Sequence, residues 1–447
     1  MASLAFYAFY NWKVVPFLIV YALLVHGMGL LISRRAGRGK TAAAVIAALL
    51  PLIIAKYSGF ALSVFGAEMT HSLVLPLGIS YFTFKSVSYL VDIKKGKAEA
   101  ERDPIVTMAF VTFFPEILTG PIDRAGNLMT QLRSGRPPLT ADEAQRGALL
   151  FLAGCFQKMV IADRIGLYVD AVYGNPDSTA GLAVVAAALG YSLQIYFDFA
   201  GCTLMALGVG RLLGFDLPRN FRRPYLGTSV ADFWRRWHIS LTSWLRDYVY
   251  IPLGGNRKGT VRKYINILIV FLVSGLWHGA GWTFVIWGLI NGALQVAEGC
   301  LGGRNRTRSK HLMAEPSQKK SGPAVWLKRL WVFLLMTVAW VFFRAPSLAE
   351  AGRIFGSMGI RLPDEACREI LAGTGLGRWD VLLMAVILIV CLIIALTGER
   401  GEDLLDRVVS RPFIVRCLIF YVLIFSVILF GIYGTAYDAA SFIYMQF

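Results

Sequence analysis

Long apolar runs separated by loops rich in lysine and arginine recur along this chain and constrain its fold more than any other feature. The clearest runs lie at residues 14–32, 41–65, 326–343, 381–396 and 413–432. Each is close to the length of about 20 residues at which an apolar helix crosses the hydrocarbon core of a bilayer. With 447 residues, 56% hydrophobic and only 16% charged, the chain cannot form an ordinary soluble surface. We therefore predict an all-α, polytopic integral membrane protein.

The charge balance fits this interpretation. Lysine and arginine total 45 against 28 aspartate and glutamate, a formal net charge of +17. The excess lies in loops between apolar runs, such as 33–40 and 94–97, as the positive-inside rule expects of cytoplasmic loops. We therefore expect the lipid bilayer, and no nucleic acid, as a partner.

Several common catalytic and binding motifs are missing from the sequence. There is no GxSxG, HExxH, P-loop or CxxC, so hydrolase, metalloprotease and ATPase functions lose their main support. The six cysteines are scattered and suggest neither a disulfide framework nor a metal site. Asn11, Trp12 and Lys13 interrupt the first apolar run, so we expect no cleaved signal peptide.

Several apolar segments carry polar residues or prolines. Segment 104–122 contains prolines that should break or kink a helix. In segment 147–172, Asp163 with Arg164 could mark a helix end at the membrane interface. We favour this interpretation over a buried ion pair between Lys158 and Asp163, which lie five apart. Segment 180–215 is too long for one perpendicular span and predicts a long or broken helix.

Segment 215–263 is the most basic region of the chain. Its tryptophans, tyrosines and Phe233 recur at spacings of three, four and seven, which predicts an amphipathic helix lying in the interface. Arg235, Arg236 and Arg246 could hold the phosphates of a cytosolic acyl donor such as coenzyme A. Contact with lipid headgroups explains these arginines equally well.

Segment 265–297 is apolar and has basic loops on both sides, so it should enter the membrane and return. Two legs of about 16 residues would reach only about 25 Å. The turn would lie at Gly275–Gly281, which places His278 deep in the bilayer beside protein or a cavity. An ionisable side chain at that depth indicates a functional site. A hydrogen bond between helices is the simpler alternative.

A histidine can accept and return a proton near neutral pH, as the attack of a hydroxyl on a thioester requires. His278 is the first candidate for this role, and His238 is the second. Gln194 and Asp198 lie four apart on one helical face, where Asp198 could orient an imidazole or where both could simply bridge helices. We also expect the polar insert 302–322 to be mobile.

The stretches DFWRRWHISLTSWLRDYVYIPLGGNR and SGLWHGAGWTFVIWG resemble the signature region of the membrane-bound O-acyltransferases, in the branch typified by the alginate O-acetylation membrane protein. Further stretches agree, among them LPLGISYFTFKSVSYLVD, FFPEILTGPIDR, QIYFDFAG, GFDLPRNFRRPYL, WVFFRAPS and FIYMQF. Because the likeness runs over residues 2–447, it implies a single acyltransferase domain, with its signature region at 194–297.

The resemblance carries expectations about the site and the reaction. It makes His278 the family's essential histidine and the general base, His238 its second characteristic histidine, and the fold a helix bundle with a central tunnel. It implies a bacterial cytoplasmic membrane enzyme that passes acetyl groups from a donor such as acetyl-CoA to hydroxyls of an extracytoplasmic polysaccharide or cell-wall polymer. It also implies a periplasmic or extracellular acetyltransferase-like partner protein, and no tightly bound cofactor or metal.

Two departures from the family pattern stand out. Leu204 occupies a position where an acid is common, and Asn291, a possible supporting polar residue, stands where a histidine is frequent. Relatives usually begin with one further apolar span, so this chain would start late or lack that helix.

Transfer of D-alanyl or another acyl group to teichoic acid is an alternative function. A transporter or channel with a buried histidine is another.

Overall fold

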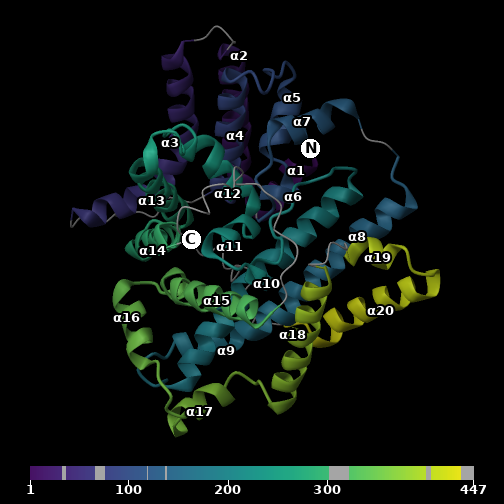
Figure 1. The fold of residues 1–447 in the computed structure, drawn as a ribbon. Helices are drawn as coiled ribbons and strands as arrows, with labels where there is room; N and C mark the ends of the chain where they lie inside the picture. Colours follow the sequence, from purple (N-terminus) through teal and green to yellow (C-terminus); the bar gives the residue numbers. More distant parts are fainter. Residues whose placement is uncertain are drawn as a thin grey trace. The chain divides into compact units, whose positions relative to one another are not determined.

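The computed structural model describes residues 1–32, 37–65, 76–117, 119–135, 138–301, 322–398 and 404–433. These residues form helices and turns, with a single isolated bridge between Gly181 and Met358 and no strand among them (Figure 1). Eight of the described helical segments are long and apolar enough to cross a membrane. The predicted all-α, polytopic class is confirmed.

The chain divides into two compact units. Unit 1 comprises Met1–Ala148 and Ala206–Arg219, and unit 2 comprises Leu149–Met205 and Asn220–Phe447. Both candidate histidines belong to unit 2. The single-domain interpretation stays a prediction, and the expected mobile insert lies outside the described residues except for Gly322.

Unit 1 contains the N-terminal helices. They are α1 (Ala2–Asn11), η1 (Trp12–Val14), α2 (Val15–Leu31), α3 (Arg38–Val64), α4 (Ile79–Lys94), α5 (Pro104–Val111), α6 (Phe114–Ile117), α7 (Ala125–Ser134) and the start of α8 (Ala141–Cys155). The runs at 14–32 and 41–65 are confirmed as α2 and α3. The expected break in 104–122 is also confirmed, because α5 ends at Val111 and α6 is a single turn that contains Pro115.

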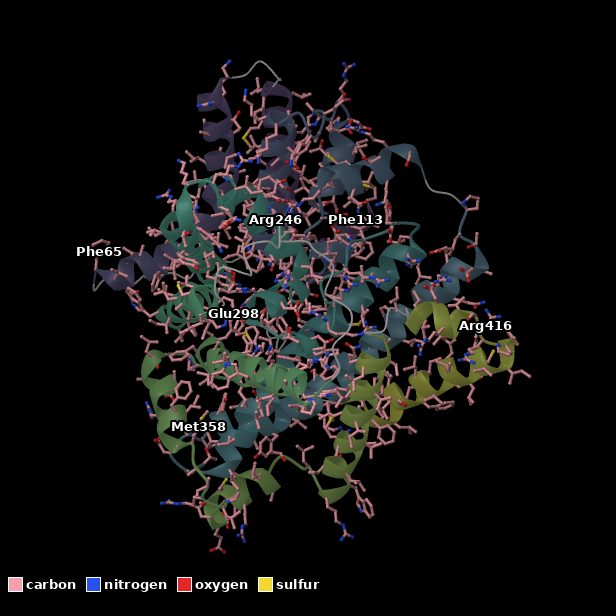
Figure 2. All side chains as sticks on the ribbon, viewed as in Figure 1. Phe65, Phe113, Arg246, Glu298, Met358 and Arg416 are labelled. Atoms are coloured by element: carbon pink, nitrogen blue, oxygen red, sulfur yellow. The ribbon has the colours of Figure 1, made fainter. Side chains whose placement is uncertain are left out.

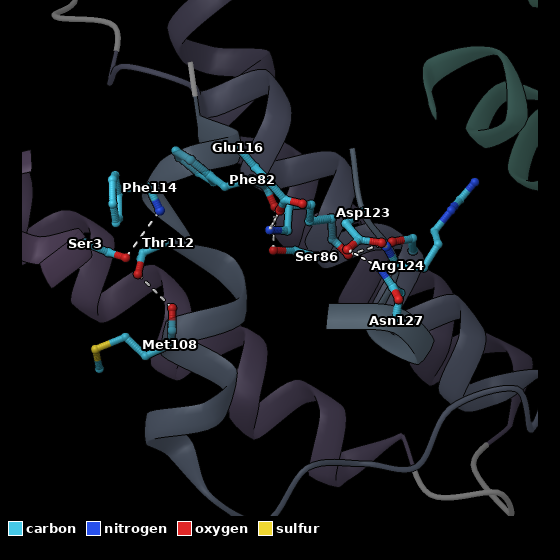
Figure 3. Close-up of polar contacts among 12 residues, drawn as sticks. Ser3, Phe82, Ser86, Met108, Thr112, Phe114, Glu116, Asp123, Arg124 and Asn127 are labelled. Carbon is cyan, nitrogen blue, oxygen red and sulfur yellow. Dashed lines mark hydrogen bonds and ion pairs between the residues drawn. The ribbon is translucent and has the colours of Figure 1, made fainter. Parts of the chain in front are cut away.

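A buried polar network ties α4, α6 and the start of α7 together. Lys85 of α4 pairs with Glu116 of α6, and the Lys85 ammonium lies 4.7 Å from the centre of the Phe110 ring. Asp123 accepts hydrogen bonds from the Arg124 backbone N–H and the Asn127 amide, as Figure 3 shows. Burial raises the pKa of Asp123 to about 6. Lys85, Glu116 and Asp123 are thus each held by a partner, as the burial of a charged group requires.

Unit 2 contains the rest of the helices. They are the end of α8, η2 (Phe156–Ala162), α9 (Asp163–Tyr173), α10 (Leu182–Leu212), η3 (Pro224–Leu226), α11 (Val230–Arg236), α12 (Ile239–Leu245), η4 (Arg246–Tyr250), α13 (Gly259–His278), α14 (Trp282–Leu301), α15 (Pro323–Arg344), α16 (Leu348–Ser357), α17 (Glu365–Ala372), α18 (Arg378–Gly398), α19 (Leu404–Val409) and α20 (Phe413–Phe430). The expected long helix is confirmed as α10, an unbroken 31 residues.

Lys158 forms a buried ion pair, and the prediction of a helix end at the interface was wrong. Its Nζ atom lies 2.5 Å from Asp163 Oδ1 and 2.9 Å from Asp198 Oδ1. The cause is the π-helical segment Phe156–Ala162, whose i to i+5 hydrogen bonding brings residues five apart onto one face. Counting with the α-helical period could not reveal this contact.

The expected interfacial helix in 215–263 was also wrong. In its middle the region forms two short α-helices, α11 and α12, which are separated at His238, where φ is 44°, with η3 before them and η4 after them. Trp234 and Trp237 are buried in the core of unit 2, against rings from α13 and α15. A left-handed residue changes the direction of the chain, so a spacing counted across it does not place the aromatic side chains on one face.

Helices α13 and α14 pack along each other as a hairpin, which confirms that segment 265–297 reverses its direction. Each leg has 20 residues, not about 16, because α13 begins inside the basic loop and α14 continues to Leu301. At a rise of 1.5 Å per residue each leg is about 30 Å long, enough to cross a bilayer. The expected legs of about 16 residues and the expected turn beginning at Gly275 are therefore wrong. α13 is helical up to His278, which is its last residue and lies at the tip of the hairpin.

Glycines allow the two legs to touch along their backbones. A Cβ atom built on Gly288 would lie 2.4 Å from the Phe271 carbonyl oxygen, and one on Gly275 would lie 2.2 Å from the Phe284 carbonyl oxygen. Small residues are common where membrane helices approach so closely. The position of His278 relative to α14 depends on this contact.

We predict that Gly288→Ala destabilises the hairpin by about 1–3 kcal/mol, the usual cost of forcing a methyl group into a packed site. Thermal unfolding of the purified protein in detergent measures this. Gly281→Ala is the matched control, because a Cβ atom there would meet only ordinary contacts at 3.8 Å and beyond. Equal melting temperatures for the two variants would contradict the close packing.

Candidate active site

Aromatic rings surround His278 at the tip of the hairpin. The imidazole is 5% exposed, and its ring centre lies 4.8 Å from Trp277, 5.2 Å from Trp287 and 5.1 Å from Phe343. These rings meet it at interplanar angles between 73° and 85°. The side chain is therefore enclosed by residues of α13, α14 and α15, which fix its orientation and limit the access of water.

His238 lies close to His278, at the junction of α11 and α12. The two imidazole centres are 6.3 Å apart, and Trp277 contacts both rings. Phe199 of α10 meets His238 at 4.7 Å and 89°. Residues 40 apart in sequence thus come together, although the sequence placed His238 on an interfacial helix.

Burial determines the protonation of His238, which lies outside the candidate spans. Its side chain is 1% exposed, and burial lowers its pKa to about 3. A neutral imidazole is therefore present at physiological pH, with one nitrogen able to donate and the other able to accept a hydrogen bond.

Asn220 holds the bend at His238, and the sequence analysis did not single it out. Its carbonyl oxygen accepts a hydrogen bond from Ile239 N–H at 2.9 Å, and its side-chain oxygen accepts one from the Ser240 hydroxyl at 2.6 Å. Asn220 is fully buried. The stretch GFDLPRNFRRPYL contained this residue, but no spacing rule points from it to a position 18 residues ahead.

Glu298 anchors the other end of α11. Its two carboxylate oxygens accept hydrogen bonds from the backbone N–H groups of Val230 and Ala231, at 3.2 and 3.1 Å. A carboxylate at a helix N-terminus satisfies unpaired donors and the helix dipole. Figure 2 labels Glu298, on α14. α11, which leads to His238, is thereby attached to the helix that carries Trp287.

The other predicted polar residues have defined contacts. Asp198 pairs with Lys158, and the Gln194 amide lies close to Gly166, where a Cβ atom would be 2.8 Å from Gln194 Nε2. Asn291 is fully buried and donates to the Trp287 carbonyl at 2.8 Å. Asn291 thus belongs to the same helical turn as a ring that encloses His278. That Asp198 orients an imidazole stays a prediction.

The three candidate donor-binding arginines each contact an acid. Arg235 and Arg236 lie 3.3 and 3.2 Å from Asp232 Oδ1, and Arg246 lies 2.8 Å from Asp247. The side chain of Arg235 is 36% exposed and that of Arg236 is 8% exposed. Of these three side chains, Arg235 is therefore the most accessible to a phosphate.

Among the described residues, no group of three or more histidine, cysteine, aspartate or glutamate side chains is arranged to hold a metal ion. That the site works without a metal stays a prediction. The tunnel expected at His278 also stays a prediction.

The family model described as "MBOAT, membrane-bound O-acyltransferase family" matches residues 41–342. "Probable alginate O-acetylase AlgI" of Pseudomonas putida is 37% identical over 372 residues, which cover 79% of this chain and 73% of that protein. "Peptidoglycan O-acetyltransferase" of Helicobacter pylori is 34% identical over 394 residues, with coverage of 80% and 72%. "Teichoic acid D-alanyltransferase" of Bacillus subtilis is 32% identical over 261 residues, with coverage of 56% and 66%.

The burial of His238 predicts a pH effect on stability. The unfolded chain binds a proton at a histidine pKa of about 6.5, whereas His238 in the folded chain does so only at a pKa of about 3. The folded state therefore loses stability as the pH falls below about 6.5. Melting temperatures at pH 7.5 and 5.5 should differ less for His238→Asn than for the unaltered protein. An identical difference would contradict the buried, neutral imidazole.

Proposed function

Because the chain belongs to the membrane-bound O-acyltransferase family and is a multi-pass membrane O-acyltransferase, we propose that it transfers acetyl groups outward across the membrane. The donor is a cytosolic thioester such as acetyl-CoA. The acetyl groups move towards hydroxyl groups of an extracytoplasmic polysaccharide or cell-wall polymer, which are their final acceptors. The basic loops, which the positive-inside rule assigns to the cytoplasm, support a bacterial cytoplasmic membrane.

The enclosed pair His278 and His238 is the observation that carries this proposal. In the proposed reaction, an acceptor hydroxyl attacks the acetyl carbonyl while His278 takes the hydroxyl proton. The new ester C–O bond forms, the C–S bond breaks, and the proton passes to the leaving thiolate. A neutral His238 nearby can donate or accept a hydrogen bond without adding a second positive charge beside the base.

The aromatic enclosure supports base catalysis at this position. Rings within about 6 Å of an imidazolium attract its charge through their negative faces. Water excluded from the site cannot compete with the acceptor hydroxyl for the acetyl group. The simpler alternative is that His278 only forms a hydrogen bond to a neighbouring helix. That role does not explain why a second imidazole and three aromatic rings lie around it.

On the donor side we propose Arg235 as a contact for the phosphates of coenzyme A. Its guanidinium is the most exposed of the three candidates. Arg236 and Arg246 fit a structural role better, because each is largely covered and lies beside a carboxylate.

Relatives named for O-acetylation of alginate and of peptidoglycan support a polymer acceptor for this chain. We also propose a secreted or membrane-anchored acetyltransferase-like protein that completes transfer to the polymer. Full polymer modification in cells that lack every such protein would contradict this part of the proposal.

Two other functions remain to be compared by experiment. Similarity to a D-alanyltransferase favours testing D-alanyl transfer beside acetyl transfer. A transporter or channel with a buried histidine would move a solute and transfer no acyl group. Purified protein given labelled acetyl-CoA and an acceptor or partner protein separates these outcomes, and transport without any acyl transfer would refute the enzyme function.

We predict that His278→Ala and His278→Gln each lower acyl transfer by roughly 10²- to 10⁴-fold, as is usual when a general base is removed. Glutamine keeps a hydrogen-bonding side chain of similar reach but cannot accept and return a proton. His238→Ala should have a smaller effect. The measurement is turnover of labelled acetyl-CoA, with expression and donor affinity checked in parallel.

Nearly full activity of His278→Gln would make His278 a structural residue. The base would then have to be sought at His238 or Asp198.

A further inference from the structure

Four cationic side chains lie together where α13 begins, and we call them the cation cluster. They are Arg257, Lys258, Arg262 and Lys263. Among the residues that the structure describes, no carboxylate pairs with any of them, whereas the three candidate donor-binding arginines each lie beside an acid. We propose that the cation cluster binds the phosphate of an anionic phospholipid at the headgroup level of the bilayer. This inference goes beyond the proposed acyl transfer and does not depend on it.

A folded turn holds the cation cluster against α13. In the loop 251–258, Gly254 and Gly255 have φ values of 105° and 55°, a region that glycine enters without steric cost. The buried Asn266 of α13 donates a hydrogen bond to the Gly255 carbonyl oxygen at 3.0 Å. A Cβ atom on Gly254 would lie 3.2 Å from the Lys258 side chain, whose stem therefore packs over the turn. The loop thus fixes where Lys258 lies.

The cations oppose one another in the absence of a ligand. Lys258 is the N-cap residue of α13, and Arg262 follows four residues later, a spacing that makes two side chains neighbours on a helix. Like charges at this spacing destabilise a helix. The first turn of α13 contains no acidic residue that would offset them. An anion bound between the two side chains would replace this repulsion by attraction.

Exposed apolar residues on the same face of α13 indicate what kind of molecule lies beside the cations. Val261 and Ile265 follow Lys258 at helical spacing and are 74% and 42% exposed. Because α13 is one of the candidate membrane spans, we assign these exposed side chains to contact with acyl chains. Cations at the end of such a face reach the headgroups while their apolar stems stay beside the acyl chains. The face therefore fits a phospholipid, with its chains and its phosphate.

Tryptophans of a second helix lie at the same end of unit 2. α14 returns beside α13 and ends near its start (Figure 1). α15 then runs back along α14, because Phe343 near its end contacts Trp287 near the start of α14. Trp326 and Trp331, near the start of α15, are 44% and 62% exposed. Exposed tryptophans of membrane helices are typical of the headgroup level. They indicate the same depth as the cation cluster.

Charge and apolar contact together select the ligand. Four positive charges without an acid favour a headgroup with a net negative charge over the zwitterionic headgroup of phosphatidylcholine, which carries its own cation. By the positive-inside rule this basic end of α13 faces the cytoplasm, where anionic lipids attract lysine and arginine. A soluble phosphate donor such as coenzyme A offers the same phosphate chemistry. It has no long acyl chain to cover Val261 and Ile265, so the observations favour the lipid.

The test titrates phosphatidylglycerol onto the purified full chain in a neutral detergent and counts bound lipids by native mass spectrometry. Phosphatidylcholine with the same acyl chains is the reference. We expect phosphatidylglycerol to bind more tightly. The double variant Lys258→Gln/Arg262→Gln should weaken its binding by roughly 25-fold, at about fivefold for each cation removed. Binding of phosphatidylcholine should change little.

Two further double variants control for charge and for position. Lys258→Arg/Arg262→Lys keeps both charges and should bind phosphatidylglycerol like the unaltered protein. Arg361→Gln/Arg368→Gln removes the same total charge from exposed arginines that do not belong to the cation cluster. Its affinity for phosphatidylglycerol should also equal that of the unaltered protein.

Melting temperatures give a second readout, because the sign of the effect depends on the lipid. Without anionic lipid, Lys258→Gln/Arg262→Gln should melt no lower than the unaltered protein, since it removes a repelling pair. With phosphatidylglycerol, the unaltered protein should melt higher than this variant, since a bound ligand stabilises the folded state. A variant that melts lower by the same amount in both conditions would show a purely structural role and would overturn the proposal.

The proposal is also overturned if phosphatidylglycerol binds no more tightly than phosphatidylcholine, or if Lys258→Gln/Arg262→Gln binds it like Arg361→Gln/Arg368→Gln. Competition identifies the source of the phosphate. If inorganic phosphate or coenzyme A displaces the lipid at constant ionic strength, the cation cluster is a site for a soluble phosphate and the lipid assignment is wrong. None of these measurements uses acyl transfer, so their failure leaves the proposed function to its own test with His278→Gln.

Discussion

The packing of aromatic rings around two buried imidazoles is the contact on which the rest of unit 2 depends. Trp287 of α14 contacts His278, and Trp340 of α15 stacks on Trp287 and packs on Trp237, the residue that follows α11. These rings come from different segments of unit 2, so the enclosure exists only when the segments are assembled. Aromatic pairs of this kind contribute about 0.5–1.5 kcal/mol each beyond the area that they bury.

Backbone contacts at the edge of this enclosure determine where the two imidazoles lie. The glycine contact between α13 and α14 sets the position of His278, and Asn220 sets the bend at His238. Glu298 then ties α11 to α14. Through these three contacts, residues far apart in sequence hold the two imidazole side chains close together.

The hydrophobic pattern predicted those parts of the fold that depend on composition alone. Residues 14–32 and 41–65 became α2 and α3, and the basic flanks around 265–297 correctly indicated a hairpin, although His278 ends the first helix and does not lie in the turn. These features follow from the cost of placing charge in hydrocarbon, which acts on each segment separately.

The pattern failed where local backbone geometry or assembly decides the outcome. Lys158 and Asp163 meet through a π-helical turn, and the left-handed residue His238 interrupts the aromatic spacing of 215–263. Arg344 donates a hydrogen bond to Asp170, which lies 174 residues earlier in the chain. No periodicity reports such contacts, because they arise only after distant helices have packed.

The pH dependence of acetyl transfer tests the central claim, that the His278 imidazole accepts the proton of the acceptor hydroxyl. For the unaltered protein, the rate with saturating labelled acetyl-CoA should fall on the acid side as the base becomes protonated. In His278→Gln the residual rate should show no such fall over the same pH range, because glutamine does not titrate. An acid limb of the same shape and midpoint in His278→Gln would contradict the account.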